Sequence, residues 1–134
     1  MKILGIGVDI IENKRVKNSI KNMQFKNRIY SSKELRQSNS IKNKTNYFSK
    51  RFAAKEAFAK ALGTGFRFNL NFKDIEIVND KMGKPHFVKT KKITNIIQKK
   101  FKVKNFDCFL SISDEKDYST AFAIIQSTKN SSSK

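Results

Sequence analysis

The stretch RFAAKEAFAKALGTG, residues 51–65, constrains the fold more than any other part of the chain. Its apolar residues recur at the three- and four-residue spacing of an amphipathic helix, which we expect over residues 46–62, with Gly63 as its C-cap. The predicted core stripe comprises Ala54, Ala57, Phe58, Ala61 and Leu62. Glu56 points nearly opposite this stripe, among neighbours that are also small or apolar, so we expect the helix to be covered on two sides.

The strand predicted for residues 3–11, ILGIGVDII, has two very different faces. Because side chains alternate along a strand, one face carries Leu4, Ile6, Val8 and Ile10, and the other carries Ile3, Gly5, Gly7 and Asp9. The two glycines leave the second face almost bare up to its carboxylate. Another element can therefore approach that face closely.

Shorter elements are predicted around the long helix. A helix over residues 13–24 should turn Val16, Ile20 and Met23 inward and Arg15, Lys17 and Lys21 outward. Ser31 and Glu34 have the spacing of a capping box for a second short helix, and the polar residues that follow are expected to form a loop. Beyond the long helix the patterns predict strands at 72–80 and 84–89 around the turn DKMG, a helix at 90–101, and a hairpin of 106–113 with 118–127.

This order of elements predicts one compact α+β domain over residues 1–127, in which an antiparallel sheet packs on the long central helix. Pro85 is expected at a strand start, where its missing N–H is tolerated. The polar tail, residues 128–134, is expected to be disordered.

The net charge of +18 suits acidic or phosphate-rich partners, through a field that salt weakens. A compositional explanation stays open, because Lys outnumbers Arg 24 to 5 and Asn and Ile are also abundant, as in chains from A- and T-rich genomes. One cysteine, Cys108, and one histidine, His86, make neither a disulfide framework nor a zinc site, and we expect both to be structural. No signal peptide or membrane span is recognisable, so a cytoplasmic location is expected.

Two acidic residues stand out because each lies among apolar or small neighbours. Glu56 could form an ion pair with Lys60, four residues along the helix. Asp9, however, ends the bare face of the first strand, and two carboxylates that meet repel each other unless a cation or a proton lies between them. Mg²⁺ commonly binds one or two protein carboxylates together with water and substrate phosphates. Asp9 and Glu56 are therefore the candidate metal ligands.

Cations and glycines near Glu56 would suit the phosphates of such a substrate. These candidate residues are Arg51, Lys55, Lys60, Gly63 and Gly65. Neither a Walker loop nor a dinucleotide-binding GxGxxG motif is present.

Four stretches carry a family resemblance: GIGVDIIENKRV near the N-terminus, RFAAKEAFAKALGTG, GKP at 83–85, and SISDEKDYSTAFAI. In this order they resemble the holo-[acyl-carrier-protein] synthase family, over essentially residues 1–127. The resemblance implies a Mg²⁺-dependent 4′-phosphopantetheinyl transferase of fatty acid synthesis. A serine of apo-acyl carrier protein attacks the β-phosphorus of coenzyme A, and 3′,5′-ADP leaves. Either a metal-bound water or a carboxylate takes the serine proton.

The resemblance also assigns residues. Asp9 and Glu56 match the metal ligands. We add Lys60 to the catalytic residues and expect Lys84 with Pro85 to form another wall of the coenzyme A pocket. Arg15 lies where the family docks the acidic carrier protein, and Lys17 and Lys21 extend its stripe. A homotrimer with active sites between subunits is implied. Some members carry histidine where this chain has Asp114, which we assign no phosphate contact.

The alternative function is a small basic nucleic-acid-binding module, motivated by the charge and the 15 aromatic residues. That function predicts aromatic and basic residues interleaved on one exposed sheet face. The phenylalanines fall mostly on apolar stripes instead, so we expect neither nucleic acid nor a membrane as a partner.

Overall fold

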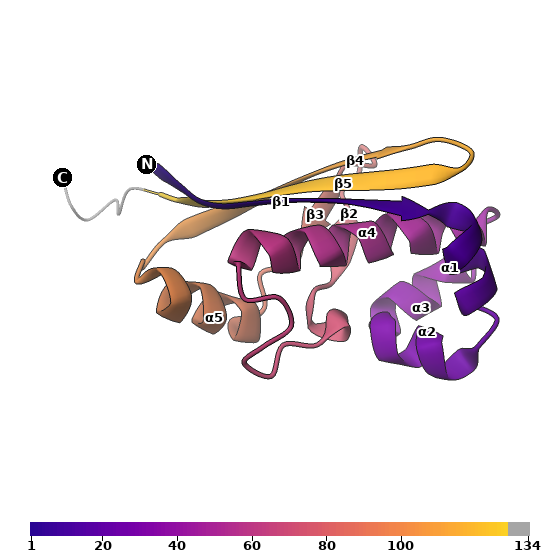
Figure 1. Cartoon of the computed structure of the whole chain (residues 1–134), viewed down its shortest axis with the longest axis horizontal. Helices are drawn as coiled ribbons and strands as arrows, with labels where there is room; N and C mark the ends of the chain where they lie inside the picture. The colour runs from indigo at the N-terminus through magenta and orange to yellow at the C-terminus, as the bar shows by residue number, and fades with distance from the viewer. Residues whose placement is uncertain (129–134) are drawn as a thin grey trace.

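The helix predicted from the alanine-rich stretch lies at the centre of the fold. In the computed structural model, which describes residues 1–128, it is α4 (Lys44–Leu62), and it packs along a three-stranded sheet (Figure 1). It begins two residues earlier than predicted, because the side chain of Asn43 accepts a hydrogen bond from the Asn46 backbone N–H and caps the first turn. It ends, as predicted, at Gly63, which has a left-handed φ of 79°.

The sheet is antiparallel, with strand order β1-β5-β4. Its strands are β1 (Lys2–Glu12), β4 (Phe106–Asp114) and β5 (Tyr118–Ser127), so the predicted C-terminal hairpin is confirmed. The faces of β1 are as predicted from Gly5 onward. They are wrong at Ile3 and Leu4, because a bulge shifts the register between Ile3 and Gly5, exposing Ile3 and turning Leu4 toward the core.

Shorter elements complete the fold, with short helices near both ends of α4 (Figure 1). They are α1 (Asn13–Ser19), α2 (Met23–Ile29), α3 (Ser32–Ser38), the 3-10 helix η1 (Phe72–Asp74), β2 (Ile77–Asn79), β3 (Pro85–Phe87) and α5 (Lys91–Phe101). The single helix predicted over 13–24 is wrong: the chain turns after α1 and starts α2, which leaves Met23 66% exposed. The capping box of Ser31 and Glu34 is confirmed.

The prediction of a strand over residues 72–80 is mostly wrong. Asn71 and Asp74 form a capping box that winds the chain into η1, and only Ile77–Asn79 pair with β3. Pro85 begins β3, as predicted. The α+β class and the antiparallel sheet on a long helix are confirmed. The domain boundary at residue 127 stays a prediction, and the expected disordered tail lies outside the described residues apart from Thr128.

A close backbone contact joins β1 to α4. A Cβ placed on Gly5 would lie 1.8 Å from the carbonyl oxygen of Ala61, and one on Gly7 would lie 1.9 Å from that of Ala57. Any side chain at either position would collide with backbone, so the close approach that the glycines predicted is confirmed. All five predicted stripe residues of α4 are buried in the main hydrophobic core of the domain.

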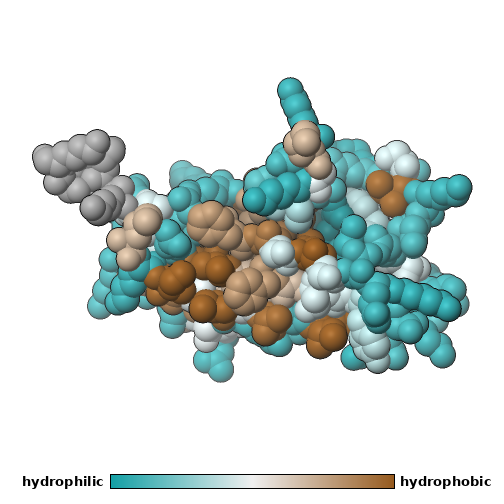
Figure 2. Space-filling model, turned by 90° about the horizontal axis from the view of Figure 1, so that it is seen from above, coloured by the Kyte–Doolittle hydropathy of each residue, from teal (hydrophilic) through white to brown (hydrophobic). Residues whose placement is uncertain are grey.

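The opposite face of the sheet is apolar and open. Its exposed side chains include Ile6, Val8, Ile10, Phe109 and Phe122. The strand register places Val8 opposite Phe122 and Ile6 in the same row as Phe109, so these side chains share one face. Figure 2 shows hydrophobic residues gathered on the side of the molecule where the sheet lies.

Three smaller predictions concern single residues and the membrane. Cys108 is half-buried against the core, and this burial raises the pKa of its thiol to about 12. His86 lies on the surface and pairs with Asp80 at 3.1 Å. Among residues 1–128, no helix has both the length and the apolarity that crossing a membrane requires, and the cytoplasmic location stays a prediction.

Candidate functional site

Asp9 and Glu56 are brought together by the contact between β1 and α4. The two elements run in opposite directions, because Gly5 lies over Ala61 and Gly7 over Ala57. Two strand residues span about 6.6 Å and four helical residues about 6 Å, so the two advances nearly match. Asp9 therefore comes level with the helical turn that ends at Glu56, and its charge acts on the pKa of Glu56.

Lys60 bonds to Asp9 and not to Glu56. Its Nζ donates to Asp9 Oδ1 at 3.0 Å and to the Val8 carbonyl oxygen at 3.1 Å. Within residues 1–128 no ion pair joins Glu56 to Lys60, so the sequence alternative of an i, i+4 pair is wrong. The lysine side chain is 55% exposed, which leaves its ammonium group open to a ligand.

The second oxygen of Asp9 has no protein partner. Oδ2 is buried and makes no hydrogen bond, although the side chain as a whole is 14% exposed. Burial raises the pKa of Glu56, the charge of Asp9 raises it further, and Lys60 opposes both effects. An unpartnered buried carboxylate oxygen beside a second acid fits a bound cation, because the cation would satisfy one group and relieve the repulsion between both.

The donor set also limits which ion fits. Among residues 1–128, no group of three or more His, Cys, Asp or Glu side chains gathers into a metal site. Two carboxylates suit a hard cation such as Mg²⁺, which keeps several water or phosphate ligands, and do not suit structural zinc.

A pocket of about 300 Å³ opens beside Glu56. It is lined by Glu56, Ala59, Lys60, Gly63, Gly65 and Phe66. Gly65, like Gly63, has a positive φ, and no atom lies within 4 Å of the Cβ that either residue lacks, so a ligand could approach this backbone closely. Sequence reasoning found Lys60 and both glycines but missed Phe66, whose only signal was an apolar residue directly after GTG.

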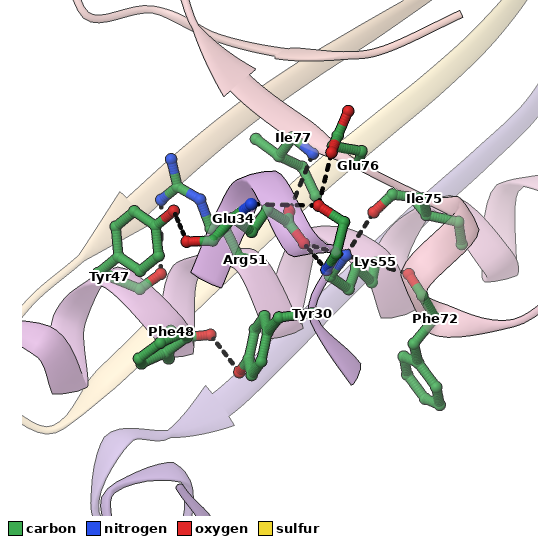
Figure 3. A network of polar contacts seen from close by, with 11 residues as sticks. Tyr30, Glu34, Tyr47, Phe48, Arg51, Lys55, Phe72, Ile75, Glu76 and Ile77 are labelled. Atoms are coloured by element: carbon green, nitrogen blue, oxygen red, sulfur yellow. Dashed lines mark hydrogen bonds and ion pairs between the residues drawn. The ribbon is translucent and has the colours of Figure 1, made fainter. Parts of the chain in front are cut away.

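Arg51 and Lys55 were predicted to bind the phosphates of coenzyme A, but both side chains are buried within the protein. The guanidinium of Arg51 stacks on the ring of Tyr47 at 3.7 Å, and burial lowers its pKa. Lys55 is fully buried and its Nζ lies 2.8 Å from Glu34 Oε1, in the network that Figure 3 shows. Both side chains are buried and neither lines the pocket, so within one chain neither is placed to bind a phosphate there.

Lys84 and Pro85 are not part of the Asp9–Glu56 pocket within one chain. Pro85 begins the strand β3 and Lys84 directly precedes it, and this strand packs beside β4. Asp9 lies on β1, at the opposite edge of the sheet. One chain therefore does not assemble the whole set of residues predicted for coenzyme A.

The predicted docking residues lie on α1 and the turn after it. Arg15, Lys17 and Lys21 are all exposed, as predicted. Lys17 and Lys21 line a groove of about 920 Å³ together with acidic residues, which are Glu12, Asp114, Glu115 and Asp117. Arg15 lies outside that groove. Asp114 accepts a hydrogen bond from the Asn46 side chain.

The chain is similar to known proteins over most of its length. The family model of the 4′-phosphopantetheinyl transferase superfamily matches residues 5–123. Holo-[acyl-carrier-protein] synthase of Pelagibacter ubique (strain HTCC1062) is 61% identical over 126 residues, which cover 94% of this chain and 98% of that protein.

Solved structures agree with this similarity. The crystal structure of holo-[acyl-carrier-protein] synthase from Neisseria meningitidis has 38% identity and a TM-score of 0.84, and the match covers 92% of this chain and 98% of that one. The holo-(acyl-carrier-protein) synthase from Bacillus anthracis, in complex with CoA (3′,5′-ADP), has 33% identity and a TM-score of 0.79. That match covers 96% of this chain and 100% of the other.

The raised pKa of Glu56 predicts how the metal-free protein responds to pH. Between the ordinary value of 4.5 and the raised value, the folded protein binds more protons at Glu56 than the unfolded chain does. Ionised Glu56 therefore destabilises the fold above this range, and the penalty disappears as the pH falls through it. We expect Glu56→Gln to be more stable than wild type at pH 7 in EDTA, with the difference shrinking toward pH 4.5. Urea unfolding measures this.

Glu12→Gln is the matched control, because Glu12 is an exposed acid on the same strand as Asp9 and its replacement changes the net charge equally. A Glu56→Gln protein that is less stable than wild type at pH 7 would contradict the repulsion inferred for the two acids.

Proposed function

Because the chain belongs to the holo-[acyl-carrier-protein] synthase family of the 4′-phosphopantetheinyl transferase superfamily, we propose that Asp9 and Glu56 hold the magnesium ion of its reaction. The protein is an enzyme that transfers the 4′-phosphopantetheine group from coenzyme A to acyl carrier protein. This activity replaces the nucleic-acid-binding alternative. The observation that carries the metal proposal is the buried, unpartnered Oδ2 of Asp9 beside a second carboxylate.

The pocket residues have separate roles in this proposal. When bound, Mg²⁺ neutralises charge on the phosphates and so makes the β-phosphorus easier to attack. Asp9 and Glu56 bind the ion. Lys60 lies between Asp9 and the pocket, where its exposed ammonium can donate to a phosphate oxygen. Gly63 and Gly65 let the phosphates approach the backbone. The serine oxygen of the carrier forms a bond to the β-phosphorus, and the bond from that phosphorus to the departing 3′,5′-ADP breaks.

We also propose that the active enzyme is a homotrimer with its sites between subunits. The open apolar sheet face supports an assembly, because a monomer rarely leaves so many large apolar side chains contiguous and exposed. The separation of Lys84 and Pro85 from Asp9 supports shared sites, since a second copy could bring these residues to the pocket. The three-fold symmetry itself rests on the family.

Arg15 is the proposed centre of carrier docking. It is exposed on α1 and lies outside the neighbouring groove with its acidic residues, so its charge is free for an acidic partner. Lys17 and Lys21 share the lining of that groove with its acidic residues, and we propose a smaller contribution from them.

Substituting either metal ligand tests the central proposal. We expect Asp9→Ala and Glu56→Ala to lose transfer by about 10³-fold or more while the circular dichroism spectrum is retained, because a metal ligand supplies several kcal/mol of transition-state stabilisation. The mass added to apo-acyl carrier protein measures transfer, with Mg²⁺ titrated from zero. Glu12→Ala is the control, and a Glu56→Ala enzyme of near wild-type rate would refute the metal role.

The assembly is tested on the open sheet face. Phe122→Asp places a charge at its middle, and we expect sedimentation to show trimers for wild type and smaller species for the variant, with transfer lost although Asp9 and Glu56 are intact. Met82→Asp, at a residue that is 92% exposed, should leave both assembly and transfer unchanged. A wild-type monomer that is fully active would overturn this proposal.

Carrier docking is tested by charge reversal. We expect Arg15→Glu to raise KM for the carrier about tenfold or more and to leave KM for coenzyme A within twofold, because the long-range attraction acts only on the acidic protein. Added salt should reproduce part of the defect in wild type. Lys33→Glu, an equal change at an exposed residue of α3, is the control. Equal effects on both substrates would remove Arg15 from the docking surface.

A further inference from the structure

A fully buried lysine, Lys55, lies next to Glu56 in sequence but on another flank of α4. Lys55 and Glu34 both have side chains with no exposed surface, and their Nζ and Oε1 atoms are 2.8 Å apart. Lys55 also donates to the carbonyl oxygens of Phe72 at 3.0 Å and Ile75 at 2.5 Å. All three of its N–H groups thus have an acceptor, which is what a buried ammonium requires.

Glu34 completes this network from the other side. Its Oε1 accepts from the Ser31 N–H at 2.9 Å, and its Oε2 accepts from the Ile77 N–H at 3.0 Å. Figure 3 shows how the side chains of Glu34 and Lys55 meet between α4, α3 and the segment around Phe72 and Ile77. The ion pair therefore fixes the backbone of η1 and the start of β2 against α4.

A chain of direct contacts leads from this network to the catalytic pocket. The carbonyl oxygen of Phe72 is bonded to Lys55, and the ring of Phe72 stacks on the ring of Phe66 with centroids 3.9 Å apart. Phe72 also stacks on Phe52, one helical turn before Glu56, at 5.6 Å. Phe66 is the aromatic wall of the pocket that contains Glu56 and Lys60. Lys55 thus fixes the position of Phe72, which in turn packs against Phe66, although Lys55 itself does not line the pocket.

We propose that Lys55 is a positioning residue for the transfer reaction: it fixes Phe72, and Phe72 holds the Phe66 wall in place against the coenzyme A pocket. This inference rests on the proposed function, because it takes the Glu56–Lys60 pocket as the place where coenzyme A binds. The role differs from plain stabilisation of the fold. A lysine that only stabilised would leave the pocket of the folded protein unchanged when replaced.

The test compares three variants of the full chain, each assayed well below its own melting temperature. Lys55→Met keeps the length of the side chain and removes the three hydrogen bonds. Phe72→Leu leaves the ion pair intact and removes the ring that supports Phe66. Lys44→Met is the control, since Lys44 is also a lysine of α4 that donates to two carbonyl oxygens, those of Ser38 and Ile41, but lies at the end of the helix far from the pocket.

We expect KM for coenzyme A to rise about tenfold in Lys55→Met and in Phe72→Leu, the usual scale of coupling through packed side chains, and KM for the carrier to stay within twofold. Lys44→Met should lower the melting temperature without this change. If Lys55→Met does not fold, Phe72→Leu decides alone. An unchanged KM for coenzyme A in the folded variants overturns the inference, whereas wild-type protein without coenzyme A-dependent transfer overturns the proposed function instead.

Discussion

The backbone contact between β1 and α4 is the constraint on which the rest of the structure depends. At Gly5 and Gly7 the strand lies directly on the carbonyl groups of Ala61 and Ala57, so only this register and this face can pack. Asp9 follows on the same face and meets the turn of Glu56 as a consequence. The other face of β1 must then carry its large apolar side chains outward, where they form the open side of the sheet. One contact therefore sets both the candidate metal site and the candidate subunit interface.

The site is arranged at some cost to stability. The carboxylates of Asp9 and Glu56 are held close together in partly buried surroundings. Lys60 donates a hydrogen bond to only one of the two oxygens of Asp9. A chain selected only for a stable fold would place an apolar residue, or a complete set of hydrogen-bond partners, at such a position. The other oxygen of Asp9, Oδ2, is buried without a hydrogen-bond partner. Buried polar atoms that the fold leaves unsatisfied are typical of functional sites. The unpartnered oxygen beside a second acid thus supports the proposed metal site at Asp9 and Glu56.

Patterns that depend on one element were readable from the sequence, and those that depend on contacts between elements were not. The stripe of α4, the glycine face of β1 and the Ser31–Glu34 capping box each follow from spacing along one segment. Lys55 was predicted to bind phosphate, because nothing local distinguishes it from Lys60. Its partner Glu34 lies 21 residues away, and the carbonyl oxygens that complete its shell belong to Phe72 and Ile75. Phe66 was missed for the same reason, since its role comes from the ring of Phe72 beneath it.

The two lysines on either side of Glu56 show how a strongly basic chain separates structural from functional charge. Lys60 lies five residues after Lys55, so at 100° per residue the two project from different sides of α4. Lys55 meets a complete shell of acceptors and stays fixed, whereas Lys60 meets one carboxylate oxygen and one carbonyl and stays 55% exposed. A fixed charge can position a wall, because its bonds would be costly to break. An exposed charge can bind a mobile phosphate, because its bonds to the protein are readily exchanged. Lysine thus serves both as a fixed structural charge and as an exposed ligand-binding charge, and the packing around α4 determines which role each lysine has.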